Sequence, residues 1–436
     1  MKKSLLAAVL VFASLTFSSC GSYSAPGNGS VGSSGSGLPP SRIKFRAFVT
    51  NPVQSLGGVN APVIDIVDAT LDEISLLGGV PFSGSITEPQ RMYLSPNMTQ
   101  TLVFSPADKA IAVVINASES VNTANNPSIK LAGVTDSIAL TQSGTIGYAA
   151  EPGAIVSGQN SGAVQVFNYT AEAVTATLPI AAAHYLALAP DGNHMLVFSD
   201  NSNSATLVAT SLIGTSAEPR STIPGFDHPV GGIFLDNGNA VVFNCGPECG
   251  GTTASVALVN IGSGTVTTIP VRGATMGLLS GTSTLYVAGT PPGTFCGSST
   301  QAQFCGTLDI VDLATQTVTQ APNLITDGFH YLMQMGANDQ LFIGSKNCTN
   351  LNANNNPNAE VRGCLSIYNT ATSAITVPPS TGDVTAIQPI TGRNVVYVCE
   401  NGLLQMYDTG TDALQTTQVK IVGQAFDVKL VDVPSN

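Results

Sequence analysis

Three of the four histidines and several aspartates lie just ahead of apolar runs that resemble one another in sequence. Aligning these runs puts His184, His330 and Asp136 at one equivalent position. Imidazole and carboxylate groups gathered there could hold a divalent cation or orient a polar ligand, although polar residues at strand starts often satisfy backbone groups instead. The full candidate set comprises His184, His228, His330, Asp136, Asp227, Asp327 and Asp383. We expect no resident cofactor, with a divalent cation at this set as the alternative.

Signatures of known catalytic sites are missing from the chain. It contains no Gly-x-Ser-x-Gly, no His-Glu-x-x-His, no Cys-x-x-Cys-His and no glycine-rich phosphate loop. An enzyme built on this sequence would therefore have to draw acid, base or metal ligands from the histidine set. We predict no catalytic residue, and a protein that binds its ligand without transforming it.

The cysteines form three local pairs and one remainder beyond Cys20. A bridge within each pair is geometrically reasonable, because each pair falls between two apolar runs whose ends would meet in an antiparallel sheet. Zinc is the rival interpretation, weakened because no pair has a second pair or a histidine beside it. Cys399 ends an apolar run, which favours a buried free thiol. The predicted disulfides are Cys245–Cys249, Cys296–Cys305 and Cys348–Cys364.

These side chains are carried by a repeated all-β unit. Short Val, Ile, Leu, Thr and Tyr runs alternate with Gly, Asn, Asp and Pro turns, and a group of four such runs recurs roughly every 45 to 56 residues. Four strands at that period indicate one β-propeller, whose blades must stack into a ring to bury their faces. The innermost strands are expected near Met92, Ser137, Tyr185, Val230, Met276, Tyr331 and Thr385, and at Phe426 to Val431.

The two ends of the chain predict how the ring closes. The N-terminal unit begins with a second-strand run at Phe45 and lacks a first run, whereas an unmatched run stands at the C-terminus. The C-terminal strand would therefore complete the N-terminal blade and bring the count to eight. Seven blades remain the alternative if one unit is irregular.

The runs Phe48–Asn51 and Val63–Asp68 resemble the Tyr-Val-Thr-Asn type of propeller repeat found in bacterial surface-layer and lactonase-like proteins. The resemblance spans nearly all of residues 44–432 and implies the fold far more than a function. As an alternative function, the resemblance implies a lactonase-like enzymatic activity. The absence of tryptophan argues against WD repeats and sialidase-type Asp boxes.

The N-terminus predicts export and a lipid anchor. Lys2 and Lys3 precede a 13-residue apolar stretch, too short to span a bilayer, and Phe17-Ser-Ser-Cys20 follows. This segment resembles a bacterial lipobox, which implies a signal peptide over 1–19 and lipidation of Cys20. Residues 20–41 then form a Gly/Ser/Pro-rich tether, and 42–436 the propeller. Gly21, in place of an aspartate, favours the outer membrane.

Composition limits the partners. The formal charge is −12, and loss of Lys2 and Lys3 would make it about −14, which argues against nucleic acid and against docking on anionic lipid.

Long second-to-third-strand loops are expected at Pro52–Ala61, Glu119–Asn126, Glu151–Ser161, Thr290–Gly306 and Lys346–Gly363. Because they would share one face, we predict a lipid-anchored envelope module that binds a protein, glycan or surface polymer there. A metal-assisted, lactonase-like hydrolase and a structural envelope spacer are the alternatives.

Overall fold

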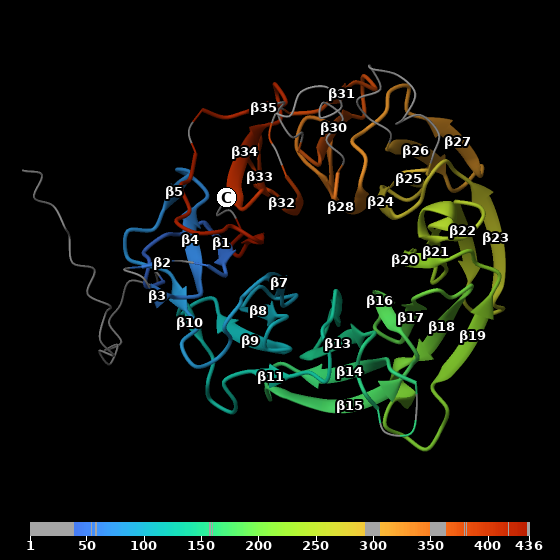
Figure 1. The fold of residues 1–436 in the computed structure, drawn as a ribbon, viewed down its shortest axis with the longest axis horizontal. Helices are drawn as coiled ribbons and strands as arrows, with labels where there is room; N and C mark the ends of the chain where they lie inside the picture. Colours follow the sequence, from blue (N-terminus) through green and yellow to red (C-terminus); the bar gives the residue numbers. More distant parts are fainter. Residues whose placement is uncertain are drawn as a thin grey trace, which may run out of the picture. The chain divides into compact units, whose positions relative to one another are not determined.

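A computed structural model describes residues 39–53, 55–56, 59–156, 158, 160–292, 306–348, 363–378, 380, 382–416 and 418–433. Within these residues, eight four-stranded antiparallel blades stand around a ring (Figure 1). The predicted all-β propeller and its eight-blade count are confirmed. Helical structure in the described part is limited to two short 3-10 turns, η1 (Thr210–Leu212) and η2 (Gly246–Cys249).

Each blade runs from an innermost strand beside the central channel to an outer strand at the rim. The innermost strands are β7 (Arg91–Leu94), β12 (Ser137–Leu140), β16 (Ala183–Leu188), β20 (Pro229–Phe234), β24 (Met276–Ser280), β28 (Phe329–Met335), β32 (Val384–Pro389) and β36 (Val428–Leu430). All eight lie where the sequence predicted them. The second strands are β1 (Arg46–Asn51), β8 (Gln100–Ser105), β13 (Ile146–Glu151), β17 (His194–Ser199), β21 (Ala240–Asn244), β25 (Thr284–Gly289), β29 (Gln340–Lys346) and β33 (Val395–Glu400).

The outer half of each blade is less regular. The third strands are β4 (Val63–Asp68), β9 (Ala110–Ile115), β14 (Ala163–Asn168), β18 (Ser204–Ala209), β22 (Ser255–Asn260), β26 (Thr307–Asp312), β30 (Leu365–Asn369) and β34 (Leu403–Asp408). The outer strands are β5 (Glu73–Ile74), β10 (Ser120–Val121), β15 (Ala173–Pro179), β19 (Arg220–Pro224), β23 (Thr265–Pro270), β27 (Thr317–Gln320), β31 (Ile375–Thr376) and β35 (Ala413–Leu414). Short strands β6 (Val80–Pro81) and β11 (Ile129–Lys130) also pair with β4 and β9, and β2 (Ser55–Leu56) forms a hairpin with β3 (Val59–Asn60).

The hydrophobic core lies between neighbouring blades, and this explains the strand sequences. Most second and third strands are buried on both faces, so they are rich in Val, Ile, Phe and Ala, whereas β18 is only half-buried. Outer strands face solvent on one side, so β23 buries Ile269 and exposes its threonines. A typical cluster joins Phe48 and Ile66 of one blade to Met92 and Val103 of the next. Stability thus depends on every blade having two neighbours.

The C-terminal strand closes the ring, as predicted. β36 pairs antiparallel with β1, with Phe48 opposite Lys429, so the first blade is built from both ends of the chain. Arg46 of β1 binds the carboxylates of Asp432 (2.7 Å) and Glu119 (2.8 Å), and all three side chains are largely buried. This arrangement ties the C-terminal segment to the first blade and to the second.

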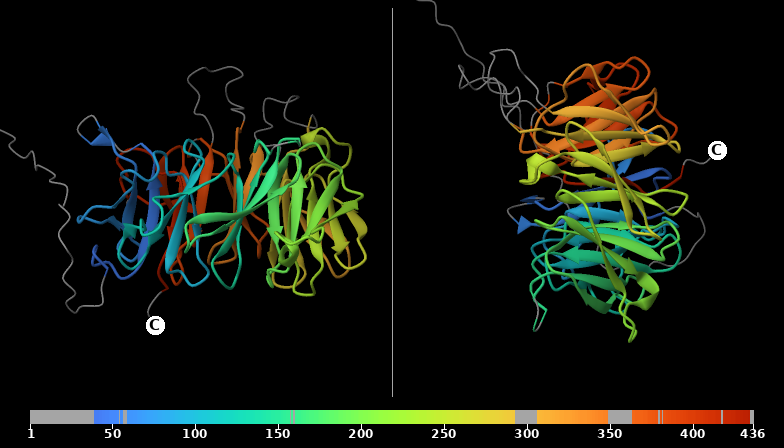
Figure 2. Two further views of the ribbon diagram at one scale, coloured as in Figure 1. Left: turned by 90° about the horizontal axis from the view of Figure 1, so that it is seen from below. Right: turned by 90° about the vertical axis from the view of Figure 1, so that its right-hand side faces the viewer.

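The connections sort onto the two faces of the disc, which the side views show edge-on (Figure 2). First-to-second turns are tight, whereas second-to-third connections and the starts of the innermost strands share the opposite face, called here the loop-rich face. One loop was misplaced by the sequence analysis. Residues 119–126 follow the third strand β9, and β8 and β9 are joined by the short turn 106–109. The repeat is degenerate in that blade, so its third strand was taken for the second.

Two of the three predicted disulfides are present, Cys245–Cys249 and Cys348–Cys364, each between the second and third strands of its blade. Cys399 is a buried free thiol, as expected. Disulfides fit an oxidising, exported compartment. The predicted Cys296–Cys305 pair, the signal peptide and Cys20 lie outside the described residues. Of the helices that are described, none has the length and hydropathy to cross a membrane.

Candidate functional site

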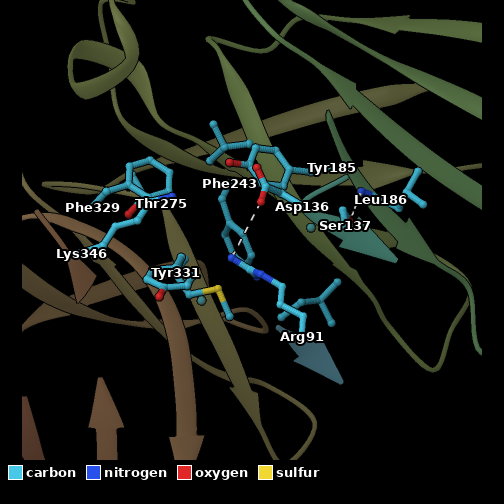
Figure 3. Close-up of a pocket in the computed structure, with 16 residues that line it drawn as sticks. Arg91, Asp136, Ser137, Tyr185, Leu186, Phe243, Thr275, Phe329, Tyr331 and Lys346 are labelled. Carbon is cyan, nitrogen blue, oxygen red and sulfur yellow. Dashed lines mark hydrogen bonds and ion pairs between the residues drawn. The ribbon is translucent and has the colours of Figure 1, made fainter. Parts of the chain in front are cut away.

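A cavity of about 220 Å³ opens at the channel on the loop-rich face, and we call it the mouth pocket (Figure 3). Its wall comes from the first residues of several innermost strands, with Arg91 opening β7, Ser137 opening β12 and Phe329 opening β28. Lys346, the last residue of β29, completes the rim. The lining residues therefore come from six blades, with a few side chains from each. Because these residues lie on or beside strands, the wall of the pocket is rigid.

A β-bulge at the start of four innermost strands decides which side chains reach the channel. In β16, Ala183 pairs with Ser199 and Tyr185 with Phe198, so His184 is the extra, unpaired residue. In β28, His330 pairs with Ser345 and Leu332 with Gly344, so Tyr331 is the extra residue there. The structural counterpart of His184 is thus Tyr331 rather than His330.

His330 is consequently not at the channel mouth, contrary to the sequence alignment. Its side chain is fully buried, and Nε2 lies 3.0 Å from the carbonyl oxygen of Thr326. Gly306 leaves room for the ring, since a Cβ there would lie 2.8 Å from Cε1. Burial lowers the pKa of His330 to about 4 despite the hydrogen bond, so the imidazole is neutral at ordinary pH. A one-residue shift in register moves a side chain to the other face of a strand.

Asp136 and His184 do come together, and Asp200 joins them. His184 Nδ1 lies 2.6 Å from Asp200 Oδ1, and its Nε2 lies 3.3 Å from Asp136 Oδ2. The imidazole stacks on the ring of Tyr185 at 4.0 Å. Burial opposes protonation, but the hydrogen bonds to the two carboxylates raise the pKa of His184 above its ordinary value. The same hydrogen bond from His184 lowers the pKa of Asp136. Both imidazole nitrogens thus face carboxylate oxygens.

Two of the remaining candidates from the sequence, Asp227 and Asp383, accept hydrogen bonds from loop backbones and so stabilise those loops. Asp227 Oδ2 accepts hydrogen bonds from the backbone and hydroxyl of Thr252 (2.9 and 2.6 Å) and from the Thr253 backbone, beyond the Cys245–Cys249 turn. Burial would raise the pKa of Asp227, but these bonds hold it at about 2.

His228 has a positive φ of 52° and places Nδ1 3.2 Å from Asp227 Oδ1. Asp383 accepts a bond from the backbone of Asn347 (2.7 Å) beside the second disulfide, and the backbone carbonyl of Asp327 accepts one from Ser345. In the described residues no group of three or more His, Cys, Asp or Glu side chains is arranged to hold a metal ion.

The sequence analysis missed two cations that face the mouth pocket. The Arg91 guanidinium lies 5.7 Å from the ring centre of Tyr331, and the Lys346 ammonium lies 5.2 Å from the same ring and 5.6 Å from that of Phe329. Burial opposes the charge of Arg91, yet nearby charged and phenolic groups keep its pKa raised. Arg91 directly precedes the predicted strand at Met92 and falls in line with Ser137 and Tyr185. This aligned position could have identified Arg91 as a residue of the channel mouth, but the sequence analysis compared only histidines and aspartates at such positions.

A second hollow of about 280 Å³ adjoins the mouth pocket between blades β16–β19 and β20–β23. His184, Tyr185 and Phe329 border it, together with His228 and Cys249 of the first disulfide. Asp200 lies on its wall. The turn closed by the Cys245–Cys249 disulfide therefore lines the surface around the channel mouth, and the disulfide holds this part of the loop-rich face in place.

Two second strands end in buried carboxyl groups that the sequence analysis did not single out. Glu151 Oε2 accepts a 2.6 Å bond from the Gly133 backbone, and Glu400 Oε2 one of 3.1 Å from the Tyr407 hydroxyl. The other carboxyl oxygen of each is buried with no hydrogen-bond partner. Burial raises the pKa of both to about 7.

The fold and the mouth pocket define a β-propeller of eight blades with a polar, aromatic-lined channel opening. No protein-family model matches the chain, and no curated protein matches it in sequence. Solved structures resemble it in fold.

One is the dihydro-heme d1 dehydrogenase NirN in complex with DHE, at TM-score 0.58 and 10% identity over 89% of this chain and 75% of that chain. Another is Kuenenia stuttgartiensis hydrazine synthase, at TM-score 0.53 and 14% identity over 76% and 96%. A third is apo AztD from Citrobacter koseri, at TM-score 0.51 and 11% identity over 88% and 97%. At these identities the likeness establishes the propeller fold alone.

Proposed function

We propose that the protein is an exported, lipid-anchored propeller that binds a ligand at the mouth pocket without transforming it. The lipid anchor is Cys20, and the outer membrane is the proposed location. The observation that carries the binding role is the mouth pocket itself, in which Arg91 and Lys346 face a cavity walled by Tyr185, Phe329 and Tyr331. Pockets that combine an apolar and aromatic lining with a few placed polar groups are typical of ligand sites.

The surrounding face supports this proposal. The starts of the innermost strands and the disulfide-linked turn at Cys249 meet around the channel, so recognition residues stand on a scaffold that needs little ordering on binding. A protein or glycan partner would reach the pocket from the loop-rich face. A structural spacer would have no need of cations held above an open cavity.

The metal-assisted hydrolase has less support. Of the two histidines that the sequence alignment placed at the channel mouth, His184 has both ring nitrogens facing carboxylates and His330 is buried, so neither offers a free nitrogen to a metal ion there. The hydrogen bonds with His184 instead hold Asp136 and Asp200 in fixed positions, with Asp136 3.9 Å from the Arg91 guanidinium. We therefore place catalysis second to binding.

Photocrosslinking in the producing cell tests the binding role. A photoreactive amino acid at Phe329 lies at the mouth pocket, whereas the same group at Asn237 lies in the tight β20–β21 turn on the opposite face. We expect adducts from position 329 and none from 237. Adducts from 237 alone, or from neither position, would overturn the proposal. Separately, Cys20→Ser should move the protein from the membrane fraction to the soluble fraction. A variant that stays membrane-bound would refute the anchor.

A further inference from the structure

We propose that the mouth pocket binds a small organic carboxylate, with its anionic head between the Arg91 guanidinium and the Lys346 ammonium and its apolar body against the pocket wall. The inference rests on the proposed function, because it names the ligand class of that same site.

Arg91 differs from the other arginines in how its guanidinium is used. Of the five described arginines that are not fully exposed, four donate hydrogen bonds to carboxylate oxygens and to backbone carbonyls. These four are Arg46, Arg220, Arg272 and Arg393. Arg91 makes no such bond within the described residues, and its nearest carboxylate oxygen, on Asp136, is 3.9 Å away. A guanidinium is a planar fork suited to bidentate carboxylate binding. The Arg91 fork lines the cavity, and the one interaction drawn for it is the long ion pair with Asp136 (Figure 3).

Lys346 places a second positive charge beside the first. Its ammonium contacts the rings of Phe329 and Tyr331, and among the described residues it has no hydrogen-bonding or ion-pair partner. Because Arg91 lies against the same Tyr331 ring, both cations border one part of the pocket. The Tyr331 hydroxyl donates to the Val384 carbonyl, which fixes the ring that supports them. One carboxylate placed there gains charge-assisted contacts from two sides.

The acidic groups nearby are engaged elsewhere. Asp136 and Asp200 bond to His184, and Asp383 accepts from the backbone of Asn347. Asp427, which lies close enough to influence Arg91, accepts a 2.6 Å bond from the Met92 backbone and pairs with Lys429 at 3.4 Å. The carboxylates are therefore held by other donors, while the two cations keep donors to spare. Asp136 still repels an anion, which disfavours a multiply charged ligand such as phosphate.

The rest of the wall selects an apolar body. Leu186, Val230, Ile233 and Met276 line the pocket with four aromatic rings, those of Tyr185, Phe243, Phe329 and Tyr331. An apolar cavity of roughly 150 Å³ accepts benzene, and the mouth pocket of about 220 Å³ leaves room for a ring with a carboxylate. Benzoate is thus a suitable probe of the class, and benzamide is its uncharged counterpart of the same shape.

Calorimetric titration of the full chain, purified in detergent at low ionic strength, tests the assignment. We expect benzoate to bind, with affinity reduced tenfold or more in Arg91→Gln and in Lys346→Gln. Arg91→Lys keeps the charge but not the fork, so a smaller loss is expected. Lys130→Gln, an exposed lysine on β11, is the matched control and should bind as the wild type does. Asp136→Asn should tighten binding several-fold, because it removes the nearest negative charge.

Benzamide and inorganic phosphate complete the test. Benzamide should bind at least tenfold more weakly than benzoate, and phosphate more weakly still. Equal binding of benzoate and benzamide, equal binding by the Arg91 and Lys346 variants, or preference for phosphate would each overturn the assignment. Failure of the wild type to bind benzoate would also overturn it. If crosslinks from position 329 then persist, the binding role stands with another ligand class; if they are absent too, both proposals fail. Circular dichroism melting of each variant checks that it is folded.

Discussion

The buried carboxyl of Glu400 predicts a stability that falls as pH rises. Its side chain has no solvent exposure, and Oε1 lies where a Cβ on Gly363 would approach to 2.2 Å, so it is enclosed by protein. Burial raises the pKa of Glu400 from an ordinary 4.5 to about 7. The folded chain therefore keeps a proton between pH 4.5 and about 7 that the unfolded chain has lost.

The size of the effect follows from that difference. At 1.36 kcal/mol for each pKa unit, ionising Glu400 lowers the free energy of unfolding by up to about 3 kcal/mol once the pH exceeds 7. The loss begins near pH 4.5 and is complete above about 7. Glu400→Gln has nearly the same shape and never ionises. We expect this variant to be close to the wild type at pH 4.5 and more stable by up to about 3 kcal/mol at pH 8.

Urea unfolding followed by far-UV circular dichroism measures the difference, since the chain has no tryptophan to report on folding. Glu218→Gln is the matched control, because Glu218 is exposed and its pKa is held at about 2 by Arg220. That control should show no gain at pH 8. If Glu400→Gln changed stability by the same amount at pH 4.5 and pH 8, the carboxyl would not titrate in this window and the reasoning would be wrong.

Three other predictions concern the core, the ring closure and the free thiol of Cys399. His330 has a folded-state pKa of about 4, below its ordinary 6.5, so the unfolded chain takes up the proton first and stability falls as pH drops from 6.5 to 4. His330→Gln should remove up to about 3 kcal/mol of that pH dependence, measured by urea unfolding at the two pH values; an unchanged acid slope would contradict it. Deleting residues 426–436 removes β36 from the first blade and should lower the melting temperature by roughly 10 °C or more, since the inter-blade packing beside β1 is lost. A melting temperature unchanged by the deletion would show that the ring does not depend on this closure. Iodoacetamide should leave Cys399 unmodified in the native protein and label it after unfolding, as read by peptide mass mapping; rapid native labelling would show that β33 is exposed.

The repeat made most of the fold predictable from the sequence. Runs such as Tyr185–Leu188 end in Asp-Gly or Asn-Gly turns that fix where the next strand begins, and closure followed from the unmatched run near Val428. Two-sided burial made the second strands conspicuous as apolar runs. The same reasoning placed two disulfides correctly, because each pair brackets a loop between paired strands.

The site was harder to predict, because side-chain direction depends on single-residue register. His184 and His330 share a sequence context, but pairing with Ser199 and Ser345 shows His330 to be the counterpart of Ala183. Lys346 carries no repeat signal, since the position at the end of the second strand varies between blades and its counterpart in the β16–β19 blade is Asp200. An alignment of strands cannot single out a side chain whose type does not recur from blade to blade.

The bulge in β28 also accounts for the chemistry of the mouth pocket. By inserting Tyr331 between the paired residues His330 and Leu332, it turns an imidazole into the core and an aromatic ring toward the channel. That ring supports both Arg91 and Lys346. The same irregularity therefore removes a metal ligand from the rim and provides the surface on which two cations can stand. Under the proposed assignment, this rearrangement favours an anion over a metal ion at the channel mouth.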